Sequence, residues 1–170
     1  TQAGVRRGAF AAYLPVEHPE VGEFLKIKDK GHPMQTLLTG ITITDEWMET
    51  MIKGDKEKRE IWAKILKSRK EKGIPYLFFE DAVNGNKPQI YKDTNSVINA
   101  SNLCSEILLP STTNESFVCC LLSMNLATIR EWEGTNIYKY IVMFLDAVME
   151  DFIRKSKQHP NKIHRYSSRK

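Results

Sequence analysis

The chain has 170 residues, of which 41% are hydrophobic and 27% charged, and its formal net charge is +4 at pH 7. This composition is ordinary for a globular domain, and no apolar run reaches the roughly 20 residues that a membrane span needs. Three cysteines do not suit a secreted disulfide framework, so we expect a reducing, cytoplasmic setting. The first residues lack the apolar stretch of a secretory signal. There is no initiator Met either, so we expect a chain that is cut from a longer protein or processed.

The positive charge is concentrated at the C-terminal end, and the rest of the chain is slightly acidic. Blocks of like charge are usually solvated or disordered, so we predict a domain over residues 1–155 and a basic tail over 156–170. Nucleic-acid binding is the alternative, but only Tyr166 could stack on a base there and no binding motif is present. The basic residues near this end, with no acidic residue among them, are Arg154, Lys155, Lys157, Lys162, Arg165, Arg169 and Lys170.

The first elements alternate between strand and helix. The apolar run over 9–14 predicts a buried strand that ends at Pro15. A helix is expected to begin at 18–20, where Pro and Glu suit a first turn, and to end before the Gly-His-Pro of 31–33. Alternating Thr and Ile over 39–44 predicts a second strand.

Two helices are predicted next. Asp45 is expected to cap a helix over 46–53, which Gly54 interrupts. Asp55 begins a longer helix that reaches about Lys72 and ends at Gly73. Its predicted apolar stripe consists of Ile61, Trp62, Ile65 and Leu66.

Residues 74–155 continue the alternation of strands and helices less regularly. Residues 74–79 predict a buried strand, and 80–96, rich in Asn, Asp, Gly and Lys, predict a loop. The sulfur-rich stretch 116–125 predicts a strand or a strand-to-loop element. Residues 135–155 predict a helix with one broad apolar face. Helices that alternate with short strands favour an α/β fold.

The strongest chemical motif is Asn102-Leu103-Cys104-Ser105-Glu106. In an extended backbone, alternate side chains share a face, so Asn102, Cys104 and Glu106 would project together. The thiol could then act on carbon, the carboxyl could move a proton, and the amide could orient a hydroxyl. The alternative is a purely structural role, in which Cys104 is a buried cysteine between two solvated polar groups.

Cys119 and Cys120 are a second candidate, either as apolar fillers of a core strand or with one of them as a redox thiol. A disulfide needs Cα atoms within about 7 Å, so Cys104 could pair with Cys119 only if their segments are neighbours. Adjacent residues of a strand face opposite ways, so at most one of the two should point toward Cys104.

The N-terminal Thr-Gln-Ala-Gly-Val-Arg is a third candidate. Gly4 gives backbone freedom, and Gln2 and Arg6 could bind a base edge or a phosphate, although a mobile basic terminus explains the composition equally well. The histidines lack paired spacing, so no metal site is predicted; they are His18, His32, His159 and His164.

Three stretches together resemble the large subunit of class I ribonucleotide reductase of phage or bacterial type: TQAGVRRGAFAAYLPVEHPEVGEFLKIK, SNLCSEILLP and ESFVCCLLSMNLA. The resemblance covers residues 1–155 and implies a fragment of a ten-stranded α/β barrel. It implies that Cys104 carries a thiyl radical that takes hydrogen from the ribose 3′ carbon. Glu106 would be the base for the 3′ hydroxyl, and Asn102 would hydrogen-bond the ribose.

The same resemblance makes Cys119 the reductive cysteine, because Asn125 follows six residues later, and leaves Cys120 as a filler. Gln2, Gly4 and Arg6 would belong to the loop that senses the allosteric nucleotide. No cofactor is expected in this chain, since a metal-containing small (beta) subunit would supply the radical.

The implied partners are that beta subunit, the remaining large-subunit segments, ribonucleotide substrates, ATP and deoxynucleotide effectors, and thioredoxin or glutaredoxin. We expect a location in the cytoplasm, or the host cytoplasm for a phage protein, and no activity from the isolated chain. The alternatives are a non-catalytic truncated or split fragment and a cobalamin-dependent relative.

Overall fold

A computed structural model describes residues 4, 8–112, 115–157 and 165–166. The chain divides into two compact units, residues 1–110 and 111–170, which we describe separately. Gln2 and Arg6 lie outside the described residues, as does most of the predicted basic tail. Gly4 is exposed in a turn, with a φ of +77°.

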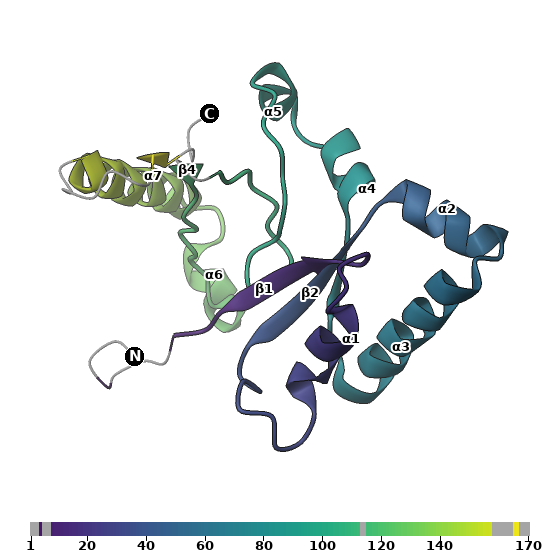
Figure 1. Cartoon of the computed structure of the whole chain (residues 1–170). Coiled ribbons are helices and arrows are strands. Elements are labelled where there is room, and N and C mark those ends of the chain that lie inside the picture. Colours follow the sequence, from purple (N-terminus) through teal and green to yellow (C-terminus); the bar gives the residue numbers. More distant parts are fainter. Residues whose placement is uncertain (1–3, 5–7, 113–114, 158–164, 167–170) are drawn as a thin grey trace. The chain divides into compact units, whose positions relative to one another are not determined.

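The first unit is built on a parallel three-stranded sheet (Figure 1). Strand β1 (Ala11–Pro15) pairs with β2 (Leu38–Ile43), which pairs with β3 (Tyr76–Phe79). Helices connect the strands, so the α/β prediction is confirmed for this unit.

Amphipathic helices cover one face of the sheet. They are α1 (Val21–Phe24), the 3-10 helix η1 (Leu25–Lys28), α2 (Asp45–Lys53) and α3 (Lys56–Lys72). Ile41 of β2 packs with Trp47 of α2 and Ile65 of α3, and all three side chains are almost completely buried. This core fixes the helices on the sheet, because burial of such side chains contributes about 1.5–3 kcal/mol each.

The opposite face of the sheet carries a smaller core. Phe78 of β3 packs with Tyr91 and Ile98, and the half-buried Tyr13 of β1 contacts the same cluster. Because side chains alternate along β3, Phe78 faces this cluster whereas Leu77 and Phe79 pack on the helix side. The residues after β3 are thereby held against the sheet.

The ends of α2 and α3 follow from local hydrogen bonds. Thr44, and not Asp45 as predicted, caps α2, since its hydroxyl accepts from the Trp47 N–H at 3.2 Å. Asp55 caps α3 as predicted, accepting from the Lys58 N–H at 3.0 Å. Gly54 follows α2 with a φ of +117°, a conformation that glycine adopts without steric cost.

The predicted loop over 80–96 is wrong, because it contains α4 (Glu80–Gly85) and α5 (Gln89–Asp93). Polar residues favour turns, but here the tertiary contacts of Tyr91 and Asn84 stabilise short helices. The Asn84 amide donates to the carbonyls of Glu80 and Ile98, each at 3.0 Å.

The second unit is dominated by α7 (Ile137–Lys157), which confirms the predicted helix. Before it come η2 (Leu126–Thr128) and α6 (Ile129–Trp132). A short strand β4 (Glu115–Ser116) pairs in parallel with β5 (Arg165–Tyr166).

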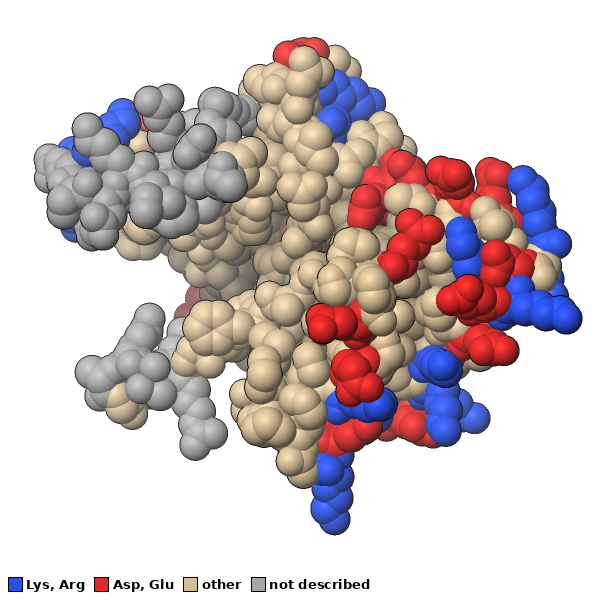
Figure 2. All heavy atoms as spheres, viewed as in Figure 1, with Lys and Arg blue, Asp and Glu red and all other residues tan. Residues whose placement is uncertain are grey.

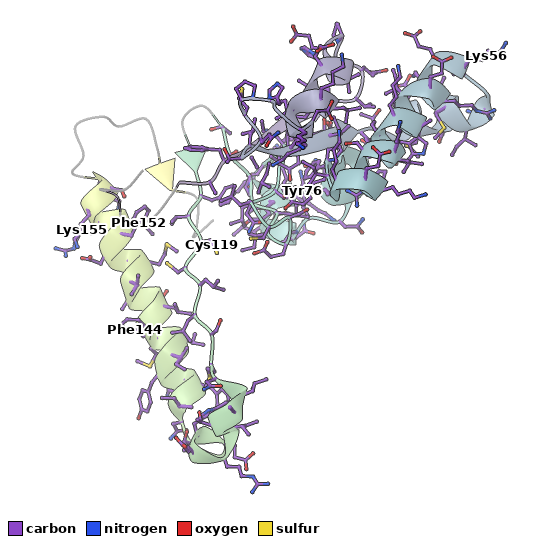
Figure 3. All side chains as sticks on the ribbon, turned by 90° about the horizontal axis from the view of Figure 1, so that it is seen from below. Lys56, Tyr76, Cys119, Phe144, Phe152 and Lys155 are labelled. Atoms are coloured by element: carbon purple, nitrogen blue, oxygen red, sulfur yellow. The ribbon has the colours of Figure 1, made fainter. Side chains whose placement is uncertain are left out.

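Of the two predictions for 116–125, the continuous strand is wrong and the strand-to-loop element is confirmed, because Ser116 ends the paired strand and the following residues form a loop. None of the α7 side chains is buried, and Phe144 is 61% exposed (Figure 3). The apolar face of α7 therefore has no packed core within the described residues.

Acidic and basic side chains are interspersed over α2 and α3, which marks the outer surface of these helices (Figure 2). None of the described helices has the length and apolar character that crossing a bilayer would require.

Candidate active-site loop

The segment 98–109 is tied to the first unit at its start. The Ile98 N–H donates to Asn84 Oδ1, and the Asn84 amide donates to the Ile98 carbonyl, both at 3.0 Å. Ile98 itself is only 2% exposed against Phe78. The loop that carries the predicted catalytic residues therefore begins from a fixed point.

A second attachment lies three residues later. The Tyr13 hydroxyl of β1 hydrogen-bonds Ser101 Oγ, and Ser101 is buried. Ser101 Oγ also donates to the Asn102 carbonyl at 3.0 Å. The residue immediately before the predicted Asn-Cys-Glu motif is thus anchored on the sheet.

The motif forms a tight turn and not the extended segment that we predicted. The Ser105 N–H donates to the Asn102 carbonyl at 3.1 Å, so Leu103 and Cys104 are the central residues of a β-turn. Ser105 has a φ of +66°, and the chain then returns so that the Asn102 N–H donates to the Ile107 carbonyl at 3.0 Å. Alternation of side chains with period two does not apply to such a turn.

The Asn102 side chain closes this turn. Its Oδ1 accepts from the backbone N–H groups of Glu106 and Ile107, both at 3.1 Å. The amide oxygen is therefore engaged by the loop itself, and the Nδ2 group is the part that could donate to a ligand. The turn that carries Asn102, Cys104 and Glu106 is held by backbone hydrogen bonds and by the Asn102 side chain, which the spacing alone did not reveal.

The alternative of a buried cysteine at position 104 is wrong for the described structure. Cys104 and Glu106 are both exposed, whereas Asn102 is half-buried. The cause is the position of Cys104 at the tip of the turn, where none of the described residues covers it. The thiol is therefore accessible to a ligand or to another segment.

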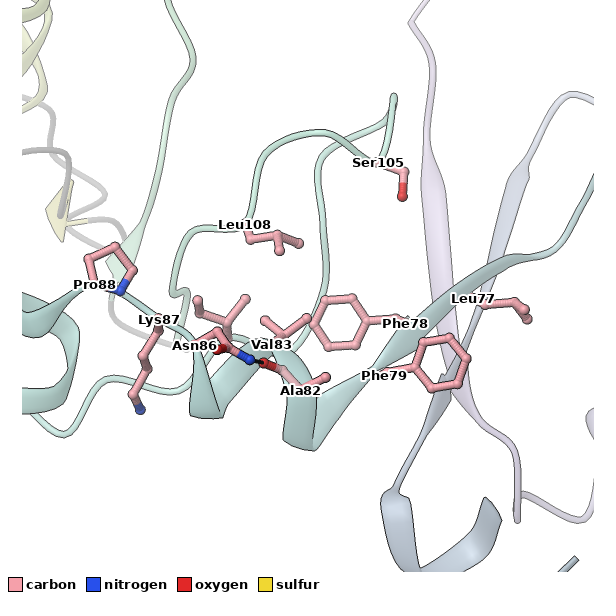
Figure 4. A pocket seen from close by; sticks show the side chains of 11 residues that line it. Leu77, Phe78, Phe79, Ala82, Val83, Asn86, Lys87, Pro88, Ser105 and Leu108 are labelled. Atoms are coloured by element: carbon pink, nitrogen blue, oxygen red, sulfur yellow. Dashed lines mark hydrogen bonds between the residues drawn. The ribbon is translucent and has the colours of Figure 1, made fainter. Parts of the chain in front are cut away.

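A pocket of about 400 Å³ adjoins this turn (Figure 4). Its apolar walls come from Phe78, Val83, Ile98 and Leu108. Ser105, the residue that follows Cys104, also lines the pocket. Apolar walls with a few polar groups are typical of small-molecule sites. No three His, Cys, Asp or Glu side chains gather into a metal site within the part of the chain that the structure describes.

The two adjacent cysteines belong to the other unit. Cys119 is exposed and Cys120 is half-buried, and both are free thiols. Cys119 lies on the segment before α6 (Figure 3). The expectation that the two adjacent residues face opposite ways applied to a strand, and residues 119 and 120 do not lie in one. The redox role of Cys119 stays a prediction, as do the nucleotide-sensing roles of Gln2, Gly4 and Arg6.

Two residues that hold the loop, Tyr13 and Asn84, were missed by sequence reasoning. Asn84 lies in the segment that we predicted to be a loop, and Tyr13 looked like an ordinary strand residue. Neither belongs to a local motif, because each acts on residues far along the chain.

Comparisons with known proteins agree on one family. The family described as ribonucleotide reductase, barrel domain, matches residues 1–58 and 54–168. The chain is 34% identical to a protein of Frog virus 3 (isolate Goorha) proposed to be a ribonucleoside-diphosphate reductase large subunit, over 89% of the chain and 30% of that protein. It is 26% identical to the ribonucleoside-diphosphate reductase large subunit of Invertebrate iridescent virus 3, over 89% of the chain and 36% of that protein.

A solved structure is also similar. The class Id ribonucleotide reductase alpha subunit of Actinobacillus ureae matches with a TM-score of 0.79 and 47% sequence identity, over 93% of the chain and 30% of that protein. The chain therefore spans roughly a third of the length of these relatives. The family match includes both the turn at 102–106 and the Cys119 segment, and this chain belongs to the ribonucleotide reductase barrel-domain family.

Proposed function

We propose that this chain forms part of the catalytic barrel of a ribonucleoside-diphosphate reductase large subunit, which reduces ribonucleotides to deoxyribonucleotides. The observation that carries the proposal is the turn at 102–107, in which backbone hydrogen bonds and the Asn102 side chain hold the loop that carries an amide, a thiol and a carboxyl. The family match over both cysteine segments supports it.

In this proposal, Cys104 acts as a thiyl radical that takes a hydrogen atom from the ribose 3′ carbon and returns it to that carbon at the end of the reaction, which regenerates the radical. Glu106 accepts the proton of the 3′ hydroxyl, and the Asn102 Nδ2 group donates to a ribose oxygen. Such groups accelerate a reaction only when they are held in position, and the hydrogen bonds to Asn102 supply that restraint.

Cys119 supplies reducing equivalents together with a second thiol from another part of the large subunit. The two thiols are oxidised to a disulfide while the ribose loses a hydroxyl as water, so that electrons and protons balance. Thioredoxin or glutaredoxin would then reduce the disulfide, and a cytoplasmic setting suits these free thiols.

The remaining large-subunit segments would have to cover Cys104, since a radical needs a site that excludes water and side reactions. A metal-containing beta subunit would supply the radical when it is bound. The loop that contains Gly4 would respond to ATP or deoxynucleotide effectors in the full subunit.

The test is deoxyribonucleotide formation by the chain assembled with the rest of the large subunit and a radical-generating beta subunit. We expect Cys104→Ser and Cys119→Ser to abolish product formation. Cys120→Ser is the matched control, because Cys120 is the predicted filler, and it should retain activity close to wild type.

Full activity of Cys104→Ser would contradict the proposed chemistry. A folded wild-type assembly without activity would favour the non-catalytic fragment. Activity that depends on adenosylcobalamin and not on the beta subunit would identify a cobalamin-dependent enzyme.

A further inference from the structure

Tyr13 occupies a central position between the sheet and the Cys104 turn. In the sheet register it lies beside Gly40 of β2, and Gly40 lies beside Tyr76 of β3. The Tyr13 ring packs edge-on against Phe78, with ring centroids 5.9 Å apart. A phenylalanine could make the same ring contacts, so they do not explain why position 13 carries a hydroxyl group.

The hydroxyl takes part in a chain of hydrogen bonds that ends at the turn. Ser101 has one hydroxyl proton, and it is donated to the Asn102 carbonyl. With the Ser101 proton assigned to the Asn102 carbonyl, we assign the Tyr13 hydroxyl as the donor to Ser101 Oγ. The Asn102 carbonyl also accepts the Ser105 N–H, which closes the turn around Cys104.

We propose that Tyr13 is a positioning residue: through Ser101, its hydroxyl fixes the Asn102 carbonyl and thereby the turn that presents Cys104. The effect of Tyr13 on catalysis rests on the proposed function, whereas the hydrogen bonds from Tyr13 through Ser101 to Asn102 do not depend on activity. Ser101 is only 8% exposed, so its hydroxyl could not readily replace the lost donor with water.

The chain contains a matched control for the hydroxyl. Tyr76 lies on the other side of Gly40 in the same register, and among the described residues no hydrogen bond to its hydroxyl is found. Tyr13→Phe and Tyr76→Phe each remove one phenolic oxygen from the same row of the sheet. Tyr13→Phe keeps the aromatic ring, so the sheet should fold normally.

The first measurement is hydrogen–deuterium exchange of the chain, followed at the Ser105 amide. Loss of one hydrogen bond is worth about 1 kcal/mol, so Tyr13→Phe should speed exchange there about fivefold, whereas Tyr76→Phe should not. Ser101→Ala should reproduce the effect, and the Tyr13→Phe/Ser101→Ala double variant should add little to it. Equal exchange in the two Tyr→Phe variants would overturn the proposal.

The second measurement is nucleotide reduction by the assembled large and beta subunits. Tyr13→Phe should displace the Cys104 thiol and so lower kcat about fivefold or more. KM should stay within about twofold of wild type, because the residues that contact the substrate are unchanged. An unchanged kcat together with faster exchange would refute a positioning role. A wild-type assembly without activity would refute the proposed function, while the exchange measurement would still decide whether Tyr13 fixes the turn.

Discussion

The phenol ring of Tyr13 fills the space that a Cβ atom would need at Gly40. A Cβ built at this glycine would lie 2.3 Å from Tyr13 Cε1, far inside van der Waals contact. The two residues are neighbours in the parallel register of β1 and β2. The ring that reaches toward Ser101 is therefore accommodated by the absence of a side chain on the adjacent strand.

Gly40→Ala should consequently destabilise the first unit. Overpacking of this kind typically costs about 1–3 kcal/mol, because the ring or the strand must shift. Urea unfolding followed by circular dichroism measures the change. Gly22→Ala is the control, since a Cβ atom at Gly22 would meet nothing within 4 Å and alanine is favoured over glycine in a helix. Equal destabilisation by both variants would show that the contact with Tyr13 is unimportant.

Ile65 and Leu66 are adjacent on α3 but differ completely in environment. Ile65 is fully buried in the main core, whereas Leu66 is 46% exposed. Ile65→Ala should lower the free energy of unfolding by about 2–5 kcal/mol, and Leu66→Ala by less than about 1 kcal/mol. Thermal or urea unfolding of the two variants tests this, and a similar loss for both would contradict the described packing.

The sequence predicted α3 and its buried face only approximately. Helical spacing identified Ile65 correctly, but it also placed Leu66 in the apolar stripe. Ser68 is buried instead, because its hydroxyl donates to the Ile74 carbonyl at 3.0 Å beyond the end of the helix. Hydrophobic periodicity cannot predict a polar residue whose partner lies past the next turn.

The candidate site shows the same limit at longer range. The residue types of Asn102, Cys104 and Glu106 and the family resemblance identified the loop, but the extended backbone was wrong. The turn depends on Asn102 Oδ1 and on the distant Tyr13 hydroxyl. A short sequence motif indicates which reactive side chains are present. It does not predict the conformation of the loop, which depends on contacts with residues far along the chain.

Asp151 near the end of α7 should titrate below the usual range of a carboxyl. Hydrogen bonds from Lys155 and then Arg154 lower its pKa from the usual 3.8, because they favour the charged form. The stabilisation is therefore present above the unfolded pKa and is lost as the pH falls through the lowered folded value. Because the Asp151 carboxylate is exposed, salt should weaken its ion pairs and reduce this lowering of the pKa.

NMR titration of Asp151 measures this pKa directly. Lys155→Met should raise it toward 3.8, because Lys155 Nζ lies 2.6 Å from the carboxylate. Lys157→Met removes a positive charge from the same last turn without a described contact to Asp151, and it should change the pKa less. An identical shift in both variants would mean that general charge, and not the ion pair, lowers the pKa.

Asn102 offers a way to separate the shape of the turn from its chemistry. Asn102→Asp keeps a side-chain oxygen that can accept from the Glu106 and Ile107 N–H groups but removes the Nδ2 donor, whereas Asn102→Ala removes both. Amide exchange at Glu106 and Ile107 should therefore stay slow in Asn102→Asp and become about fivefold faster in Asn102→Ala. If the amide also donates to the ribose, both variants should lose nucleotide reduction in the assembled enzyme. Fast exchange in Asn102→Asp would mean that the oxygen does not hold the turn, and full activity of Asn102→Asp would exclude the Nδ2 group as a substrate contact.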